Sequence, residues 1–154
     1  MEQIKLSSEI REASGTSGAK QLRKEGKIPA VVYKSGKIGI NISTDKKELW
    51  KALHTGAGEN ALITLDISGG AKPAKKTVIV QEIQHDPLSD EILHVDFHEI
   101  SLKEKIKVSV PVQIKGEAEG VKVGGVLNQV LWEMEVECLP TDIPEHIVIN
   151  VSEL

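Results

Sequence analysis

The chain has 154 residues, enough for one domain or two small ones, and 40% of them are hydrophobic but only 3% aromatic. The core must therefore consist mainly of Val, Ile and Leu. No run approaches the roughly 20 apolar residues of a membrane span, and the N-terminus lacks the apolar core of a signal peptide. We expect a soluble cytoplasmic protein with no membrane partner. The single cysteine excludes an internal disulfide and a multi-cysteine zinc site.

The formal net charge of −4 argues against nucleic-acid binding, but the charge is unevenly distributed. Residues 1–97 carry 14 basic and 13 acidic side chains, whereas residues 98–154 carry 5 basic and 10 acidic ones. Within residues 20–51 there are 9 basic against 3 acidic side chains, a local charge of +6. A functional interpretation must explain this basic segment in an acidic chain.

Alternation of apolar and polar residues predicts a mainly β protein with a few short helices. Strands are predicted at residues 2–10, 28–33, 38–43, 61–67, 77–84, 91–98, 105–114, 130–138 and 146–151. A hairpin turn is expected at 34–37. Pro111 lacks an N–H, so its strand should lie at a sheet edge or contain a bulge. Strand 130–138 should have an acidic solvent face and a core face made of Val130, Trp132, Met134, Val136 and Cys138.

Two helices are predicted in the first part of the chain. Residues 44–55 should form one helix, with Asp45 as N-cap and Gly56 as its C-terminal stop. Its apolar stripe would consist of Leu49, Trp50 and Leu53. A shorter helix is expected at 18–25, ended by Gly26.

A change of pattern near residues 98–104 suggests a domain boundary. Before it, predicted strands alternate with helices and basic loops; after it, the pattern is purely β and acidic. We therefore expect domains at residues 1–98 and 99–154, each with a modest core and packed against the other.

Strand 91–98 carries His94, Asp96 and His98 on one face and apolar residues on the other. Three such ligands on one face could bind zinc or iron, and His85 could add a fourth. The same face could instead be a polar outer surface over an aliphatic core. A third interpretation is that it presents hydrogen-bond donors and acceptors to RNA base edges and 2′-hydroxyls.

Residues 15–27 combine a Gly/Ser-rich loop with a basic stretch, and Arg11 precedes them. Backbone N–H groups and lysines in such a segment could hold phosphates. The segment lacks the Gly-Lys-Ser/Thr ending of a nucleotide P-loop, so nucleotide binding is not expected. The alternative interpretation is a solvated flexible loop.

Catalytic arrangements of side chains do not stand out. Cys138 lies on the apolar side of its strand without basic neighbours in sequence, which is typical of an inert core thiol. No Ser/His/Asp set or pair of carboxylates is distinguished by its spacing. We do not expect an enzyme.

Several ordered strings resemble a known family. GAKQLRKEGKIPAVVY, VQEIQHDP and ILHVDF resemble the bacterial large-subunit ribosomal protein number twenty-five, the 5S-rRNA-binding family. VPVQIKGEAEGVKVGGVLNQV and VECLPTDIPEHIVINVSEL resemble the second domain of its longer version, the general stress protein CTC type. The resemblance implies a small N-terminal β-barrel with helices and a C-terminal β-rich domain. It also implies a non-catalytic ribosomal protein in the central protuberance, beside neighbouring large-subunit proteins and without a metal or cofactor.

The resemblance further implies an RNA-binding site. In the family, the barrel docks on the minor-groove side of an internal-loop helix in 5S rRNA. The residues here that match its RNA-contact pattern are Arg11, Lys20, Arg23, Tyr33, Gln84, His94 and Asp96. The last two would reach base edges or 2′-hydroxyls, and the three basic residues would hold phosphates.

Departures from the family pattern leave alternatives. Thr16 and Gln21 stand where basic residues are usual, which suggests a stress-related interaction protein with weakened rRNA binding. The metal-dependent protein based on the histidine-rich strand is the other alternative. Longer relatives continue past the position of Leu154 into a further strand and an acidic tail, so the chain is expected to be naturally short or trimmed.

Overall fold

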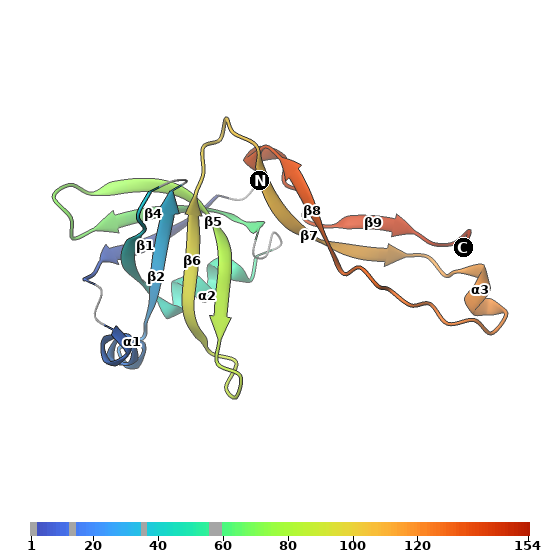
Figure 1. Cartoon of the computed structure of the whole chain (residues 1–154), viewed down its shortest axis with the longest axis horizontal. Coiled ribbons are helices and arrows are strands. Elements are labelled where there is room, and N and C mark those ends of the chain that lie inside the picture. Colours follow the sequence, from blue (N-terminus) through green and yellow to red (C-terminus); the bar gives the residue numbers. More distant parts are fainter. Residues whose placement is uncertain (1–2, 13–14, 35–36, 56–59) are drawn as a thin grey trace.

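The computed structural model of the chain describes residues 3–12, 15–34, 37–55 and 60–154. A closed six-stranded β-barrel is followed by a three-stranded sheet that extends away from it as an arm (Figure 1). The expected mainly β fold with a few short helices is thereby confirmed. None of the described helices is both long and apolar enough to cross a membrane.

The barrel contains six strands in the order β1-β3-β2-β6-β5-β4. Their bounds are β1 (Gln3–Ile10), β2 (Lys27–Lys34), β3 (Ile40–Asp45), β4 (Leu62–Ser68), β5 (Ala74–His85) and β6 (Ile92–Glu99). The pairs β1–β4 and β2–β6 are parallel, and the other four pairs are antiparallel. Closure leaves the barrel without an unpaired sheet edge. Residues of alternating strand positions fill its interior with aliphatic side chains around the single phenylalanine, Phe97.

Helix α2 (Lys46–Leu53) confirms the predicted N-cap. The side-chain Oδ1 of Asp45 accepts hydrogen bonds from the backbone N–H groups of Lys47 and Glu48, at 2.9 and 3.1 Å. The predicted stop at Gly56 lies outside the described residues. Leu49 and Leu53 are buried in the barrel core, as is Ala52. The predicted apolar stripe is wrong at Trp50, which is 56% exposed, because α2 turns only its narrower face to the barrel.

Helix α1 (Gly15–Lys24) begins earlier than expected. The Gly/Ser-rich segment that leads into the basic stretch forms the first turn of this helix. The interpretation of residues 15–27 as a solvated flexible loop is wrong, because Gly15–Lys24 is helical and Lys27 begins β2. The predicted stop at Gly26 is confirmed: its φ of +79° is a conformation that favours glycine. Of the predicted 34–37 turn, Ser35 and Gly36 lie outside the described residues.

The second sheet has the order β8-β7-β9, with β7 (Ile106–Lys115), β8 (Glu133–Cys138) and β9 (Ile147–Asn150). Between them lie the short helices α3 (Glu119–Lys122) and η2 (Pro140–Asp142). The prediction that the strand of Pro111 lies at a sheet edge or contains a bulge there is wrong, because β7 is central and pairs with β8 in continuous register up to Pro111. The proline is tolerated since β7 pairs with β9 only from Val112 onward.

A second hydrophobic cluster joins the sheet to the barrel. Leu62 and Ile79 of the barrel pack with Ile100 and with Val108 and Val110 of β7. The predicted core face of strand 130–138 is only partly correct. Val136 and Cys138 pack against this cluster, whereas Val130 is 85% and Trp132 67% exposed. No second layer covers that part of the sheet within the described residues, so alternation there does not produce burial.

Candidate nucleic-acid interface

The outer face of strands β2, β6 and β5 carries most of the polar residues that the sequence singled out. On β6, Val95 and Phe97 are fully buried, so the alternating residues His94, Asp96 and His98 lie on the outer face. The predicted division of this strand into a polar face and an apolar face is confirmed.

Strand register brings residues from β5 and β2 beside β6. Gln84 of β5 lies opposite His94, and Tyr33 of β2 lies opposite His98. A bulge between Val80 and Glu82 shifts the register of β5, so that Gln84 faces outward with His94. Four of the seven predicted RNA-binding residues thus share one face: Tyr33, Gln84, His94 and Asp96.

His94 and Asp96 form a close polar pair on this face. The distance between His94 Nδ1 and Asp96 Oδ1 is 2.9 Å, and the side chains are 25% and 22% exposed. When Nδ1 carries the proton, it donates to the carboxylate and leaves Nε2 as an acceptor. The pair therefore offers both an imidazole nitrogen and a carboxylate oxygen at fixed positions on a rigid strand.

The same residues do not form a metal centre. Among the residues that the structure describes, no three His, Cys, Asp or Glu side chains are placed to hold one metal ion. His85, the suggested fourth ligand, lies near the β5–β6 turn, where its Nδ1 is 3.4 Å from the carbonyl oxygen of Asp90. The metal-dependent alternative has no support in this geometry.

Arg23 and Lys20 bring positive charge to the border of the face. The Arg23 guanidinium donates to the carbonyl oxygen of Leu93 at 3.1 Å, which ties α1 to the residue before His94. Lys20 is exposed and lies three residues earlier on the helix, so both cations project from the same side of α1. Arg11 is anchored elsewhere: its Nε donates at 3.1 Å to the carbonyl oxygen of Ile42, a residue of β3.

Two further cations near Tyr33 are already engaged by a carboxylate. Glu99 lies 2.6 Å from Lys76 Nζ and 3.5 Å from Lys34 Nζ. Burial alone would raise the pKa of Glu99, but the hydrogen bond and charge of Lys76, together with Lys34, outweigh burial and hold the pKa below its ordinary value. These lysines contribute less to a phosphate contact than their number suggests.

Glu82 belongs to the face but was missed by reasoning from the sequence. It lies opposite Asp96 across β5 and β6, which places two carboxylate-bearing residues side by side. Simple alternation along β5 cannot predict this position, because the bulge changes the phase of the strand. The face is consequently mixed in charge, with carboxylates at its centre and cations along α1.

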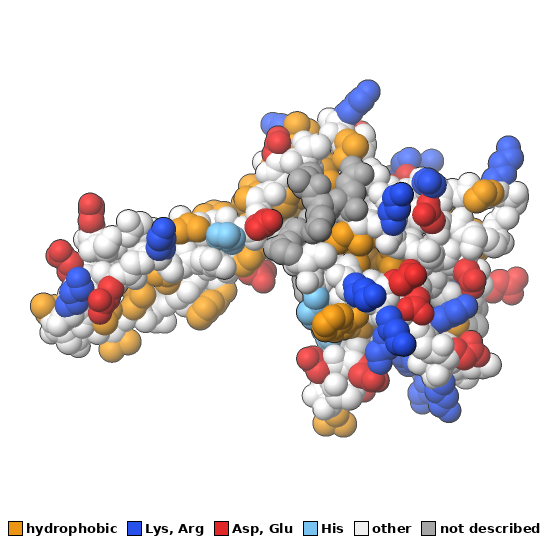
Figure 2. Space-filling view, turned by 180° about the vertical axis from the view of Figure 1, so that it is seen from behind, with side chains coloured by type: hydrophobic (Ala, Val, Ile, Leu, Met, Phe, Trp, Pro, Cys, Tyr) orange, Lys and Arg blue, Asp and Glu red, His pale blue; other side chains and the backbone are white. Residues whose placement is uncertain are grey.

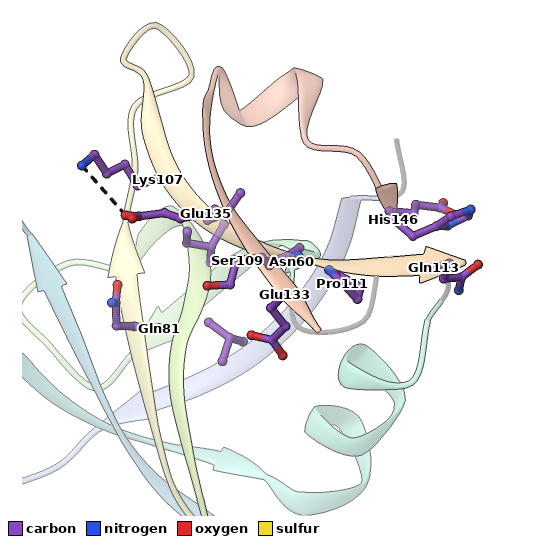
Figure 3. Close-up of a pocket in the computed structure, with 13 residues that line it drawn as sticks. Asn60, Gln81, Lys107, Ser109, Pro111, Gln113, Glu133, Glu135 and His146 are labelled. Carbon is purple, nitrogen blue, oxygen red and sulfur yellow. Dashed lines mark hydrogen bonds and ion pairs between the residues drawn. The ribbon is translucent and has the colours of Figure 1, made fainter. Parts of the chain in front are cut away.

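A cavity lies elsewhere, between β5 and the second sheet. It has a volume of about 520 Å³, and Glu133, Glu135 and Glu145 line it (Figure 3). Lys107 Nζ lies 3.9 Å from Glu135, and His146 is also at the wall. This predominance of carboxylates disfavours phosphate, so the outer face of β2, β6 and β5 is the better candidate for RNA.

Comparisons with known proteins agree over both parts of the chain. The Ribosomal L25p family matches residues 6–97, and the C-terminal domain of ribosomal protein TL5 matches residues 105–154. A large ribosomal subunit protein bL25 from Halothermothrix orenii is 43% identical over 154 residues, covering 100% of this chain and 69% of the relative. Another from Geobacter sulfurreducens is 46% identical over 154 residues, covering 100% and 78%. The chain therefore belongs to the Ribosomal L25p family, in the form that carries a TL5-type C-terminal domain.

Proposed function

We propose that this chain, as a component of the large ribosomal subunit, binds 5S rRNA in the central protuberance through the outer face of β2, β6 and β5 together with α1. Similarity to proteins named large ribosomal subunit protein bL25 supports the ribosomal part of this proposal. The observation that carries the site is the His94–Asp96 pair, flanked by Gln84 on β5 and by Arg23 on α1.

The chemistry of the face suits the minor groove of an RNA helix. A-form RNA has a wide, shallow minor groove that displays 2′-hydroxyls and base edges, and a rigid sheet surface can meet it. Asp96 would be repelled by phosphates, so its partners must be donors such as a base amino group or a 2′-hydroxyl. His94 and Gln84 add groups that accept or donate, which allows choice between base edges.

Phosphate contacts would come from the basic residues around the face. Lys20 is exposed on α1. Arg23 is half-buried at the border of the face, and Arg11 is half-buried where it contacts Ile42 of β3. Such contacts provide much of the affinity and make it dependent on salt. Thr16 and Gln21 are exposed on α1 without charge. The number of phosphate contacts should therefore be small.

The two parts of the chain would have different tasks. Residues 1–98 would form the RNA-binding domain. Residues 99–154 carry 10 acidic and 5 basic side chains, which gives this part a formal net charge of −5. This acidic part would face neighbouring ribosomal proteins or solvent rather than phosphate.

A salt titration of binding to isolated 5S rRNA tests the proposal. The full chain should bind saturably at low salt, and log K against log salt should have a slope of about −2 to −3, from roughly 0.7–0.9 per phosphate contact and three basic residues. A variant with Lys103→Gln, an exposed lysine of the acidic part, should leave the slope unchanged. Absence of saturable binding at low salt would overturn the proposal. If the chain bound 5S rRNA no more tightly than it bound a plain RNA duplex, the result would instead favour the stress-related interaction protein.

A further inference from the structure

The outward side of α2 carries an aromatic stack that the proposed 5S site does not use. The Trp50 ring stacks on the His54 ring with centroids 4.0 Å apart and an interplanar angle of 19°. His54 is exposed, and its Nδ1 lies 2.8 Å from the Trp50 carbonyl oxygen, which fixes the ring over the helix end. A large aromatic surface held open to solvent in this way is available to a ligand.

Two lysines flank the stack. Lys47, Trp50, Lys51 and His54 follow the spacing i, i+3, i+4 and i+7 and therefore lie on one face of α2; we call this set the α2 stripe. Both lysines are exposed, and neither forms an ion pair within the part of the chain that the structure describes. The one carboxylate of the helix, Glu48, accepts instead from the backbone N–H of Ser7 at 3.4 Å.

The α2 stripe lies on a different side of the barrel from the proposed 5S interface. Helix α2 packs on β1 and β3, whereas the interface is formed by β2, β6 and β5, which lie in front of α2 in Figure 1. Figure 2 views the molecule from behind and shows hydrophobic, histidine and lysine or arginine side chains close together on this side of the barrel. A ligand on the stripe would leave the other face free.

We propose that the α2 stripe binds an unpaired nucleotide of a single-stranded RNA segment. The base would stack on Trp50, and the flanking phosphates would contact Lys47 and Lys51. An aromatic ring between two cations is complementary to a flat base between two anions. A protein partner fits less well, because Trp50 is the one large hydrophobic side chain exposed on the described part of α2, too little for an apolar interface core.

Fluorescence of Trp50 provides the test. The chain has two tryptophans, so the full chain with Trp132→Phe has Trp50 as its single tryptophan. Titration with a short oligoadenylate should quench the Trp50 emission saturably. In parallel, the anisotropy of labelled oligoadenylate should report roughly 5- to 150-fold weaker binding for Trp50→Leu, the range for loss of one base–aromatic stack. Trp50→Phe should retain most of the affinity.

The lysines are tested by a matched pair of double variants. Lys47→Gln with Lys51→Gln should reduce the salt slope by about 1 to 1.5, from roughly 0.7 per phosphate contact on a single strand. Lys103→Gln with Lys105→Gln, two exposed lysines outside the barrel, should not. Circular dichroism should show an unchanged fold for Trp50→Leu, because the side chain is exposed.

Two results would overturn the proposal: no saturable quenching at low salt, or equal affinity of Trp50→Leu and the parent chain for oligoadenylate. If Trp50→Leu kept the affinity for oligoadenylate but lost binding to a ribosomal protein, the stripe would be assigned to a protein partner. Asp96→Ala, measured alongside, should leave the quenching intact. Failure of 5S rRNA binding and failure of the α2 stripe are therefore distinguished.

Discussion

Asp96 is a carboxylate on a surface that we propose approaches a polyanion, and this placement makes it informative about specificity. Its partner His94 holds it at 2.9 Å, and the strand beneath it is anchored by the fully buried Val95 and Phe97. An acidic side chain at such a position weakens contact with phosphates. It strengthens contact with hydrogen-bond donors on bases and riboses.

Asp96→Ala should therefore reduce discrimination more than affinity. We expect a loss of about 1–3 kcal/mol in the preference for the internal-loop helix of 5S rRNA over a plain duplex, the usual value of a specific base contact. Competition binding with the two RNAs measures this difference. Unchanged discrimination would show that the β6 face does not read the RNA.

Lys20→Ala should have the opposite signature. Because an exposed lysine contacts phosphate without reading sequence, its loss should weaken binding to both RNAs by similar factors and reduce the salt slope by about 1. Lys20→Arg serves as the control that keeps the charge. A variant that lost affinity for only one of the two RNAs would contradict the assignment of Lys20 to a phosphate.

Among the elements, α2 has the clearest local determinant. Asp45→Ala removes the acceptor for the N–H groups of Lys47 and Glu48 and should lower the free energy of unfolding by about 1 kcal/mol. Urea denaturation measures this change. Asp45→Asn, which keeps a capping oxygen, should be close to the parent chain, and equal destabilisation by both variants would argue against the cap.

Elements determined by local chemistry were predictable, and those determined by tertiary packing were not. The Asp45 cap, the Gly26 stop and the alternation of β6 depend on neighbours in the sequence, and all three were predicted. The exposure of Trp50 and Trp132 was not predicted, because each follows an apolar periodicity but has no opposing layer within the described residues. The β5 bulge could not be predicted from the sequence either, because it is defined by the pairing of β5 with β6.

Taken over the entire chain, the net charge of −4 is an average of unlike parts. The basic segment 20–51 contains Lys20 and Arg23 of α1 and the two lysines of the α2 stripe, whereas residues 98–154 carry 10 acidic against 5 basic side chains. Family membership confirms the expectation of a non-enzymatic ribosomal protein. The barrel itself was predictable only through the family resemblance, because its two parallel pairs join strands far apart in the chain.

The proposed division of tasks predicts that the barrel binds RNA without the arm. This prediction requires that the barrel stays folded without the cluster that joins Ile79 to Val108 of the arm. Circular dichroism and urea denaturation of the 1–98 fragment establish its fold before binding is measured.

The most direct test of the account is the affinity of the full chain and of the folded 1–98 fragment for isolated 5S rRNA, measured side by side at several salt concentrations. We predict saturable binding by both proteins, with affinities and salt slopes that agree closely, and a clear preference for 5S rRNA over a plain duplex. Absence of saturable binding by either protein at low salt, or binding by the full chain but not by the folded fragment, would contradict it.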